Sequence, residues 1–102
     1  MPWYLYLAAF FSGLFLANTV PHFTHGISGD KFPTPFAKPP GKGLSSAPVN
    51  VLWALFNLIA GTVLFRIGHV WNSDNLALIL FFAGAAFISI MLSFHFQNKH
   101  PE

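Results

Sequence analysis

Three long runs of apolar residues, separated by two polar stretches, divide the chain. The first, residues 3–20, carries no charged side chain. At about 1.5 Å per helical residue it is just long enough to cross the ~30 Å hydrocarbon layer of a bilayer. The second and third runs, residues 48–71 and 75–96, are of similar length and contain few polar side chains. The pattern predicts an all-α integral membrane protein with about three transmembrane helices in a single membrane domain, residues 1–102.

The segment between the first two runs has a different character. Proline and glycine alternate along residues 21–47, which favours turns and extended backbone over a helix. We therefore predict that the first helix ends before Pro21 and that a long loop follows it. Phe23, Phe32 and Phe36 lie in this loop, whereas a free linker is typically poor in aromatic residues. The loop is expected to lie on the membrane face or to fold back onto the helices.

The starts of the second and third helices carry capping signals. Ser46 or Ala47 is the expected N-cap of the second helix, because Pro48 follows them. Proline is favoured at the first helical position, where a backbone N–H would have no partner. Asp74 ends a short polar turn and is predicted to be the N-cap of the third helix. So short a connection predicts that the second and third helices form an antiparallel hairpin.

The composition excludes several classes of protein. The 102 residues are 54% hydrophobic and 8% charged, against roughly 45–50% and about 25% in soluble domains. The formal net charge of +2 supplies too few cations for a surface that follows nucleic-acid phosphates, so no nucleic-acid partner is expected. The absence of cysteine excludes disulfides, thiolate nucleophiles and cysteine-ligated metals.

The distribution of cations predicts an orientation. Three crossings place the long loop and the C-terminus on the same side of the membrane. That side holds Lys31, Lys38, Lys42 and Lys99, whereas Arg66 lies near the other side. The positive-inside rule makes the lysine-bearing side cytoplasmic and leaves the N-terminus outside.

Small residues recur along one stripe of each apolar run. In lipid, helices associate through close backbone packing and polar side chains rather than through hydrophobic force. Three such stripes predict a compact bundle or an oligomer. The predicted packing positions are Ala9, Gly13, Ala17, Ala54, Gly61, Gly68, Ala85, Ser89 and Ser93.

The histidines form the main candidate site. With three crossings, His22, His25 and His95 fall at one interface, and Asp30 lies in the adjoining loop. Imidazole and carboxylate groups suit a metal ion, and neutral imidazole is also an axial ligand of haem. The alternative is a set of interfacial histidines that bind nothing and stabilise helix C-termini. Asn18 and Asn50 are expected to lie at the same depth in the membrane and to form a polar layer that supports these histidines.

Two further positions carry weaker signals. Asn57 lies inside the second apolar run and is expected to hydrogen-bond to another helix, with a conduction path as the alternative. Lys42 lies between two glycines just before a helix, but the position five residues before Gly41 is Phe36, so the phosphate-binding P-loop pattern is absent. A lipid headgroup is the expected contact of Lys42.

Three hypotheses about function follow from these features. The first is a non-catalytic subunit, assembly factor or interaction component of a membrane complex or homo-oligomer, with the bilayer and other membrane subunits as partners. The second is a membrane protein that binds a metal ion or haem through histidine. The third is a lipid-active or small-solute transport protein. No motif in the chain identifies an enzymatic reaction, and a Ser-based hydrolase triad is not indicated.

Overall fold

The computed structural model describes residues 2–72 and 75–97, and within them the chain is all-helical. Each of the three α-helices is long and apolar enough to cross a membrane, which confirms the predicted set of three apolar helices. No β-strand forms in the described ranges, where the only β-type pairing is an isolated antiparallel bridge between Phe32 and Ser45. The elements in chain order are α1 (Trp3–Ile27), α2 (Ala47–Ile67), the short 3-10 helix η1 (Val70–Asn72) and α3 (Asn75–Phe96).

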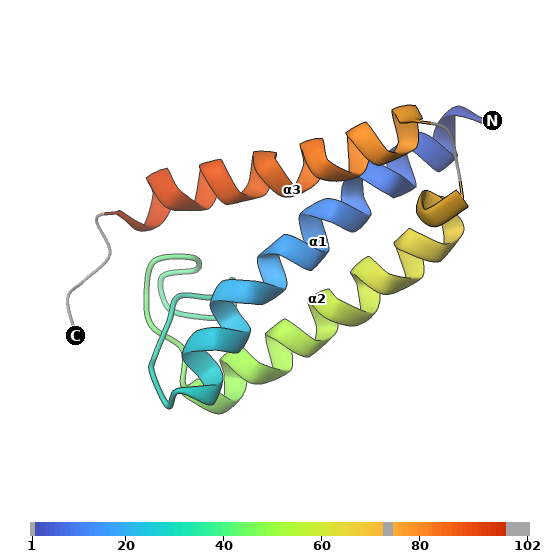
Figure 1. The fold of residues 1–102 in the computed structure, drawn as a ribbon. Helices are drawn as coiled ribbons and strands as arrows, with labels where there is room; N and C mark the ends of the chain where they lie inside the picture. The colour runs from blue at the N-terminus through green and yellow to red at the C-terminus, as the bar shows by residue number, and fades with distance from the viewer. Residues whose placement is uncertain (1, 73–74, 98–102) are drawn as a thin grey trace.

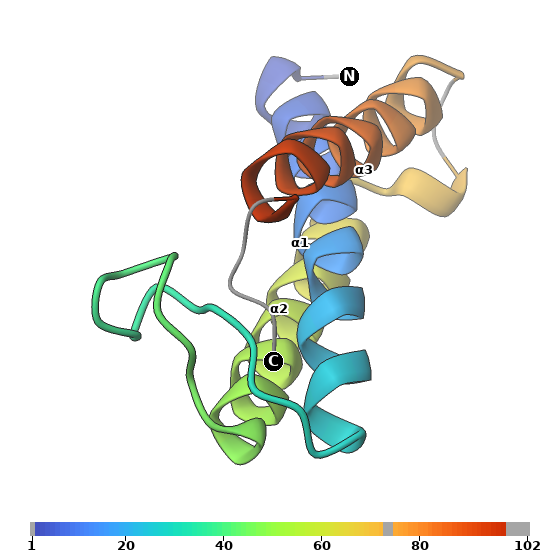
Figure 2. The same ribbon diagram turned by 90° about the vertical axis from the view of Figure 1, so that its left-hand side faces the viewer.

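Helix α1 is the centre of the arrangement. It packs against both α2 and α3, while α2 and α3 make no extensive contact with each other. Figure 1 shows α2 and α3 on opposite sides of α1, diverging from each other towards the end at which α3 finishes, and Figure 2 shows the same arrangement from the side. The loop between α1 and α2 lies at the same end of the molecule as the C-terminal end of α3, and η1 lies at the opposite end, near the start of α1.

The first helix is longer than the sequence pattern predicted. It continues through Pro21 as far as Ile27, so the prediction of a loop from residue 21 is wrong. A proline removes one backbone donor, but neighbouring helices can hold the rest of a transmembrane helix together around it. The helix ends at Ile27 with Ser28 as its C-cap. Gly29 follows, and its φ of 78° lets Asp30 N–H donate to His25 O at 2.9 Å and Gly29 N–H donate to Gly26 O at 3.1 Å. These two bonds form a Schellman motif.

The second helix begins as its capping signal predicted. Ser46 is the N-cap, and its Oγ accepts a hydrogen bond from Val49 N–H at 3.4 Å. The helix ends at Ile67, before the predicted residue 71, because Gly68 forms the C-cap and η1 follows. The predicted cap of the third helix, Asp74, lies outside the described residues.

Helices α1 and α3 approach each other through a pair of glycines. A Cβ added to Gly13 would collide with the carbonyl of Phe81, and one added to Gly84 would collide with the carbonyl of Phe10. Each glycine therefore lets the backbone of the opposite helix pass closely, as in small-residue interfaces of membrane helices.

Glycines on α2 meet α1 in a similar way. A Cβ on Gly61 would meet Leu16, and one on Gly68 would meet Leu5 and Ala9. Of the positions predicted to pack, Ala9, Gly13, Ala54, Gly61 and Gly68 are buried, and Ala17 and Ala85 are half-buried.

The packing face of α3 differs from the predicted one. Its buried residues are Ala77, Gly84 and Ile88, whereas Ser89 and Ser93 are exposed. Small residues occur on two faces of α3, and the sequence alone did not show that Gly84 faces Gly13. The reciprocal fit of two glycines, one on each helix, fixes the face that packs.

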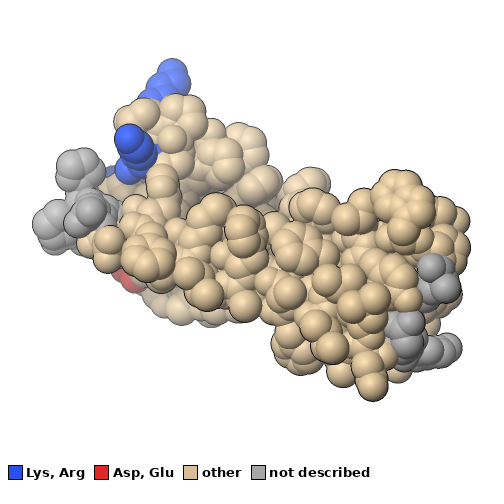
Figure 3. All heavy atoms as spheres, turned by 90° about the horizontal axis from the view of Figure 1, so that it is seen from above, with Lys and Arg blue, Asp and Glu red and all other residues tan. Residues whose placement is uncertain are grey.

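The surface is apolar and the interior is partly polar. Large side chains such as Leu52 (67% exposed) and Phe82 (61% exposed) point outwards, whereas Ser12, Asn50 and Asn57 are fully buried. On the face shown in Figure 3, the charged side chains gather at one end. This distribution is the reverse of that in a soluble domain and suits helices surrounded by lipid.

Candidate functional site

The interface between α1 and α2 contains a row of buried polar contacts. Ser12 Oγ–H donates to Gly61 O at 2.7 Å. Further along, Asn18 Nδ2–H donates to Asn57 Oδ1 at 3.0 Å, and Asn57 Nδ2–H donates to Trp53 O at 2.8 Å. Because the two helices run antiparallel, later residues of α1 contact earlier residues of α2. Asn57 thus bonds across to another helix, in the arrangement expected for it.

The third contact of this row organises the loop. Asn50 is fully buried, and its Nδ2 donates to the carbonyl oxygens of Phe32 (2.9 Å), Ser45 (3.2 Å) and Ser46 (3.1 Å). Its Oδ1 lies 2.8 Å from Nδ1 of His22. Since the amide nitrogen is the donor, Oδ1 must accept, and Nδ1 of His22 must carry the proton. The neutral imidazole then has its lone pair on Nε2.

The loop, residues 28–46, folds back onto the helices. Phe32 and Ser45 exchange backbone hydrogen bonds at 3.2 and 3.0 Å, which closes the base of the loop. The hydroxyls of Thr34 and Ser45 are 2.6 Å apart, and Gly41 N–H donates to Thr34 O at 2.8 Å. Gly41 has a φ of 73°, a conformation that glycine adopts without strain. Phe32 and Thr34 are buried as a result, so the loop is part of the packed structure.

Phe32 joins the histidines of α1 to α3. The ring of His25 stacks on Phe32 with 4.3 Å between centroids, and His22 meets the same ring edge-on at 5.4 Å. Phe96 of α3 contacts it at 4.8 Å. Asp30 lies 3.7 Å from Nδ1 of His25, with both side chains partly exposed.

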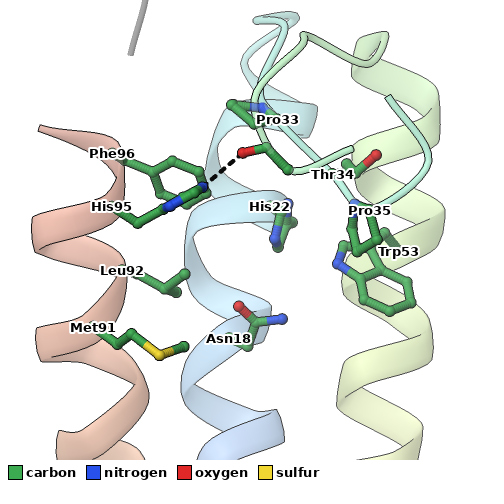
Figure 4. Close-up of a pocket in the computed structure, with 11 residues that line it drawn as sticks. Asn18, His22, Pro33, Thr34, Pro35, Trp53, Met91, Leu92, His95 and Phe96 are labelled. Carbon is green, nitrogen blue, oxygen red and sulfur yellow. Dashed lines mark hydrogen bonds between the residues drawn. The ribbon is translucent and has the colours of Figure 1, made fainter. Parts of the chain in front are cut away.

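A cavity of about 280 Å³ lies between the three helices beneath the loop. Figure 4 shows His22 between His95 of α3 and Trp53 of α2, with Asn18 further along α1. None of the described residues that line the cavity is Lys, Arg, Asp or Glu. They are Asn18, His22, Pro33, Thr34, Pro35, Gly41, Trp53, Met91, Leu92, His95 and Phe96.

His95 connects α3 to the loop. Its Nε2 lies 2.7 Å from Gly41 O, and because a carbonyl can only accept, Nε2 carries the proton (Figure 4). The side chain is exposed, unlike that of His22, which is 3% exposed. His22 lines the cavity, whereas its partner Asn50 does not.

The structure places the predicted metal or haem ligands in separate contacts. His22 bonds to Asn50, His25 stacks on Phe32 near Asp30, and His95 bonds to the loop. Within the part of the chain that the structure describes, no three His, Asp or Glu side chains are close enough to hold one metal ion. Lys42, the predicted headgroup contact, is exposed on the loop.

Two residues of the site were not among the predicted site residues. Phe32 and Trp53 supply the rings around His22, yet aromatic residues are frequent throughout this chain. Phe32 indicated only that the loop folds back. Trp53 lies three residues after Asn50 and four before Asn57, so helix periodicity places it on the same face as these two predicted polar residues.

Chemically, the site combines an apolar cavity with a few fixed hydrogen-bonding groups, which suits a structural role or an uncharged ligand. Comparison with known proteins gives no match, since no family model, curated protein or solved structure is detectably similar to the chain. Inference about its function therefore rests on the residues and geometry described above.

Proposed function

We propose that the protein is a non-catalytic interaction subunit of a membrane complex. The proposal rests on one observation, which is that the buried polar side chains hydrogen-bond to other parts of the same chain. Ser12, Asn50 and Asn57 all hydrogen-bond within the chain. They hold α1, α2 and the loop in one arrangement, which is the property of a docking component rather than of a reactive centre.

The apolar outer surface supports three membrane crossings. The three helices of the structure meet the length and hydropathy that a crossing requires. Polar groups turned inwards and large apolar groups turned outwards suit a lipid environment. Among the described residues of α1 and α3 there is no Lys, Arg, Asp or Glu, and in α2 there is only Arg66, close to its end.

A groove between α1 and α3 offers a place for a partner. An apolar groove of about 410 Å³ lies along α1 and α3, lined in part by Ala17, Pro21, Ser89 and Ser93. Small side chains let another helix approach closely, and exposed serine hydroxyls can bond across such an interface. We propose that a transmembrane helix of another subunit docks here, which gives Ser89 and Ser93 the packing role expected from the sequence.

A photo-cross-linking experiment tests this docking. A photoreactive amino acid at position 89 is expected to form a covalent adduct with a membrane protein in native membranes, and Ser93→Leu should reduce the yield at least about fivefold by blocking close approach. Position 83, an exposed alanine on another face of α3, is the matched control for the cross-linker. Mass spectrometry of the adduct distinguishes another subunit from a second copy of the chain. A stable monomer without an adduct at position 89 would contradict the proposal.

The topology gives a separate prediction. Lys31, Lys38 and Lys42 lie on the loop, at the end of the molecule where α3 finishes. A reporter enzyme that works only in the cytoplasm should therefore be active when fused to the C-terminus and inactive when fused to the N-terminus. Activity of both fusions would exclude an odd number of crossings.

A further inference from the structure

His22 lines the cavity beneath the loop and carries a hydrogen-bond acceptor. The side chain is 3% exposed, and its Nδ1–H is held by Asn50 Oδ1 at 2.8 Å. The proton position leaves the lone pair on Nε2, and Asn50, the partner of Nδ1, is not among the residues that line the cavity. An acceptor on a side chain that lines a mainly apolar cavity suits a ligand with an O–H or N–H group.

A second acceptor lies on the same wall. Asn18 donates through Nδ2 to Asn57, which fixes the orientation of its amide and leaves Oδ1 as an acceptor. Asn18 also lines the cavity, and Figure 4 shows its oxygen directed towards the side of α3. The two acceptors come from one face of α1, since residues four apart on a helix are neighbours.

The remaining walls are mainly apolar. Trp53 and Phe96 supply aromatic rings, and the other lining residues are Pro33, Thr34, Pro35, Gly41, Met91, Leu92 and His95. Of the two polar side chains among these, Thr34 is hydrogen-bonded to Ser45 and His95 to Gly41 O. In Figure 4 the indole nitrogen of Trp53 lies on the edge of its ring nearest His22, and the two ring centroids are 6.4 Å apart. An indole N–H is a donor only, so it can bond to the oxygen of a ligand that donates to His22.

We propose that this cavity binds an uncharged aromatic hydroxyl compound, such as a phenol or the quinol headgroup of a membrane lipid. Its hydroxyl donates to Nε2 of His22, and its ring lies among Trp53, Phe96 and the two prolines. No Lys, Arg, Asp or Glu is among the described residues that line the cavity, which favours an uncharged ligand because an ion would have no opposite charge to offset its desolvation. The volume of about 280 Å³ is near the lower end of ligand pockets, ~300 Å³, which suits a single substituted ring.

The ligand is expected to enter from the lipid. Trp53 lines both this cavity and an apolar groove on the outer face of α2, formed with Phe36, Val49, Leu52 and Phe56. A lipid with a quinol headgroup could leave its tail in that groove. This entry shares no lining residue with the groove between α1 and α3, although the cavity itself shares Leu92 and Phe96 with that groove. Ligand binding is therefore tested on the isolated chain, without a partner.

Binding can be tested with three small probes that share one carbon skeleton. Thymol has an aromatic ring and a hydroxyl, its methyl ether lacks the O–H, and menthol has the hydroxyl on an aliphatic ring. With the full chain in lipid nanodiscs and nitrogen-labelled histidine, thymol should shift the NMR signal of His22 Nε2. Its affinity should exceed that of the ether about tenfold, the value of one buried hydrogen bond, and that of menthol severalfold.

Two variants separate the pocket from the fold. His22→Asn places an amide N–H near the position of Nδ1, so it keeps the bond to Asn50 and removes the acceptor at Nε2. It should fold normally and bind thymol about tenfold more weakly. Met91→Phe should weaken binding by filling the cavity, whereas Ile90→Phe, an exposed neighbour that does not line it, should not.

A longer probe distinguishes the source of the ligand. If decylubiquinol binds more tightly than thymol, and if Leu52→Ser abolishes this difference in affinity, the ligand is a membrane quinol. If thymol binds and decylubiquinol binds no more tightly, the ligand is a small phenol. Equal affinity for thymol and its methyl ether, or an unshifted His22 signal at saturation, would overturn the proposal, whatever the result of the cross-linking at Ser89.

Discussion

Replacing Asn50 by leucine is expected to release the loop from the helices and to lower the free energy of unfolding by about 2–4 kcal/mol. Leucine has the same branched side-chain skeleton but a larger volume, and it cannot donate to the three loop carbonyls or accept from His22. Each buried group left without a partner costs roughly 1–3 kcal/mol. The loss is smaller than the sum of the bonds because Phe32 O and Ser45 O keep their backbone partners.

Trypsin offers a direct measurement of this release. The loop carries Lys31 and Lys42, both exposed, and cleavage there requires the backbone to leave its folded conformation. In Asn50→Leu, cleavage should be at least about tenfold faster, since 1.4 kcal/mol corresponds to a factor of ten. The matched control is Asn75→Leu, the same substitution at an exposed position of α3. An unchanged cleavage rate in Asn50→Leu would show that Asn50 does not hold the loop.

Replacing Gly84 by leucine is expected to separate α3 from α1. Even the Cβ of the new side chain would collide with the carbonyl of Phe10, and neither backbone can move without losing the fit of Gly13 against Phe81. We expect the free energy of unfolding to fall by at least about 3 kcal/mol, at the upper end of overpacking effects. Titration with SDS, followed by the circular dichroism of the helices, measures this change.

The neighbouring residue supplies the control for Gly84. Ala83 is exposed, so Ala83→Leu adds a side chain of the same final size on the outer surface of α3 and should change stability by less than about 0.5 kcal/mol. Because Asn50 holds the loop to α1 and α2, Gly84→Leu should also leave the loop largely protected from trypsin. Equal stability of the two variants would show that α1 and α3 do not pack through this glycine pair.

The sequence was informative wherever the relevant signal was local. A run of apolar residues of sufficient length indicates a transmembrane helix whatever its neighbours are, and each of the three runs forms a long apolar helix, although α1 extends to Ile27 and α2 ends at Ile67. The cap at Ser46 is equally local, since it depends on one hydroxyl and the first turn of α2. Membrane insertion and orientation stay predictions until the reporters are measured.

The end of α1 shows how a local signal can be outweighed. Pro21 indicates a break, but it removes only one hydrogen bond, and packing against α2 and α3 holds the helix together on both sides of it. The residue that terminates the helix, Gly29, could not be told from the several other glycines in the sequence. Its role depends on the positive φ that the chain adopts at this position.

The sequence by itself determined the three apolar helices, the cap of α2 and the candidate polar residues, because each depends on residues close together in the chain. Only the tertiary structure decided which of those residues meet. The bond of His22 to Asn50 joins positions 28 residues apart, and the approach of Gly13 to Phe81 joins two different helices. Helix periodicity leaves several faces able to pack, and the choice among them depends on how two surfaces fit in three dimensions.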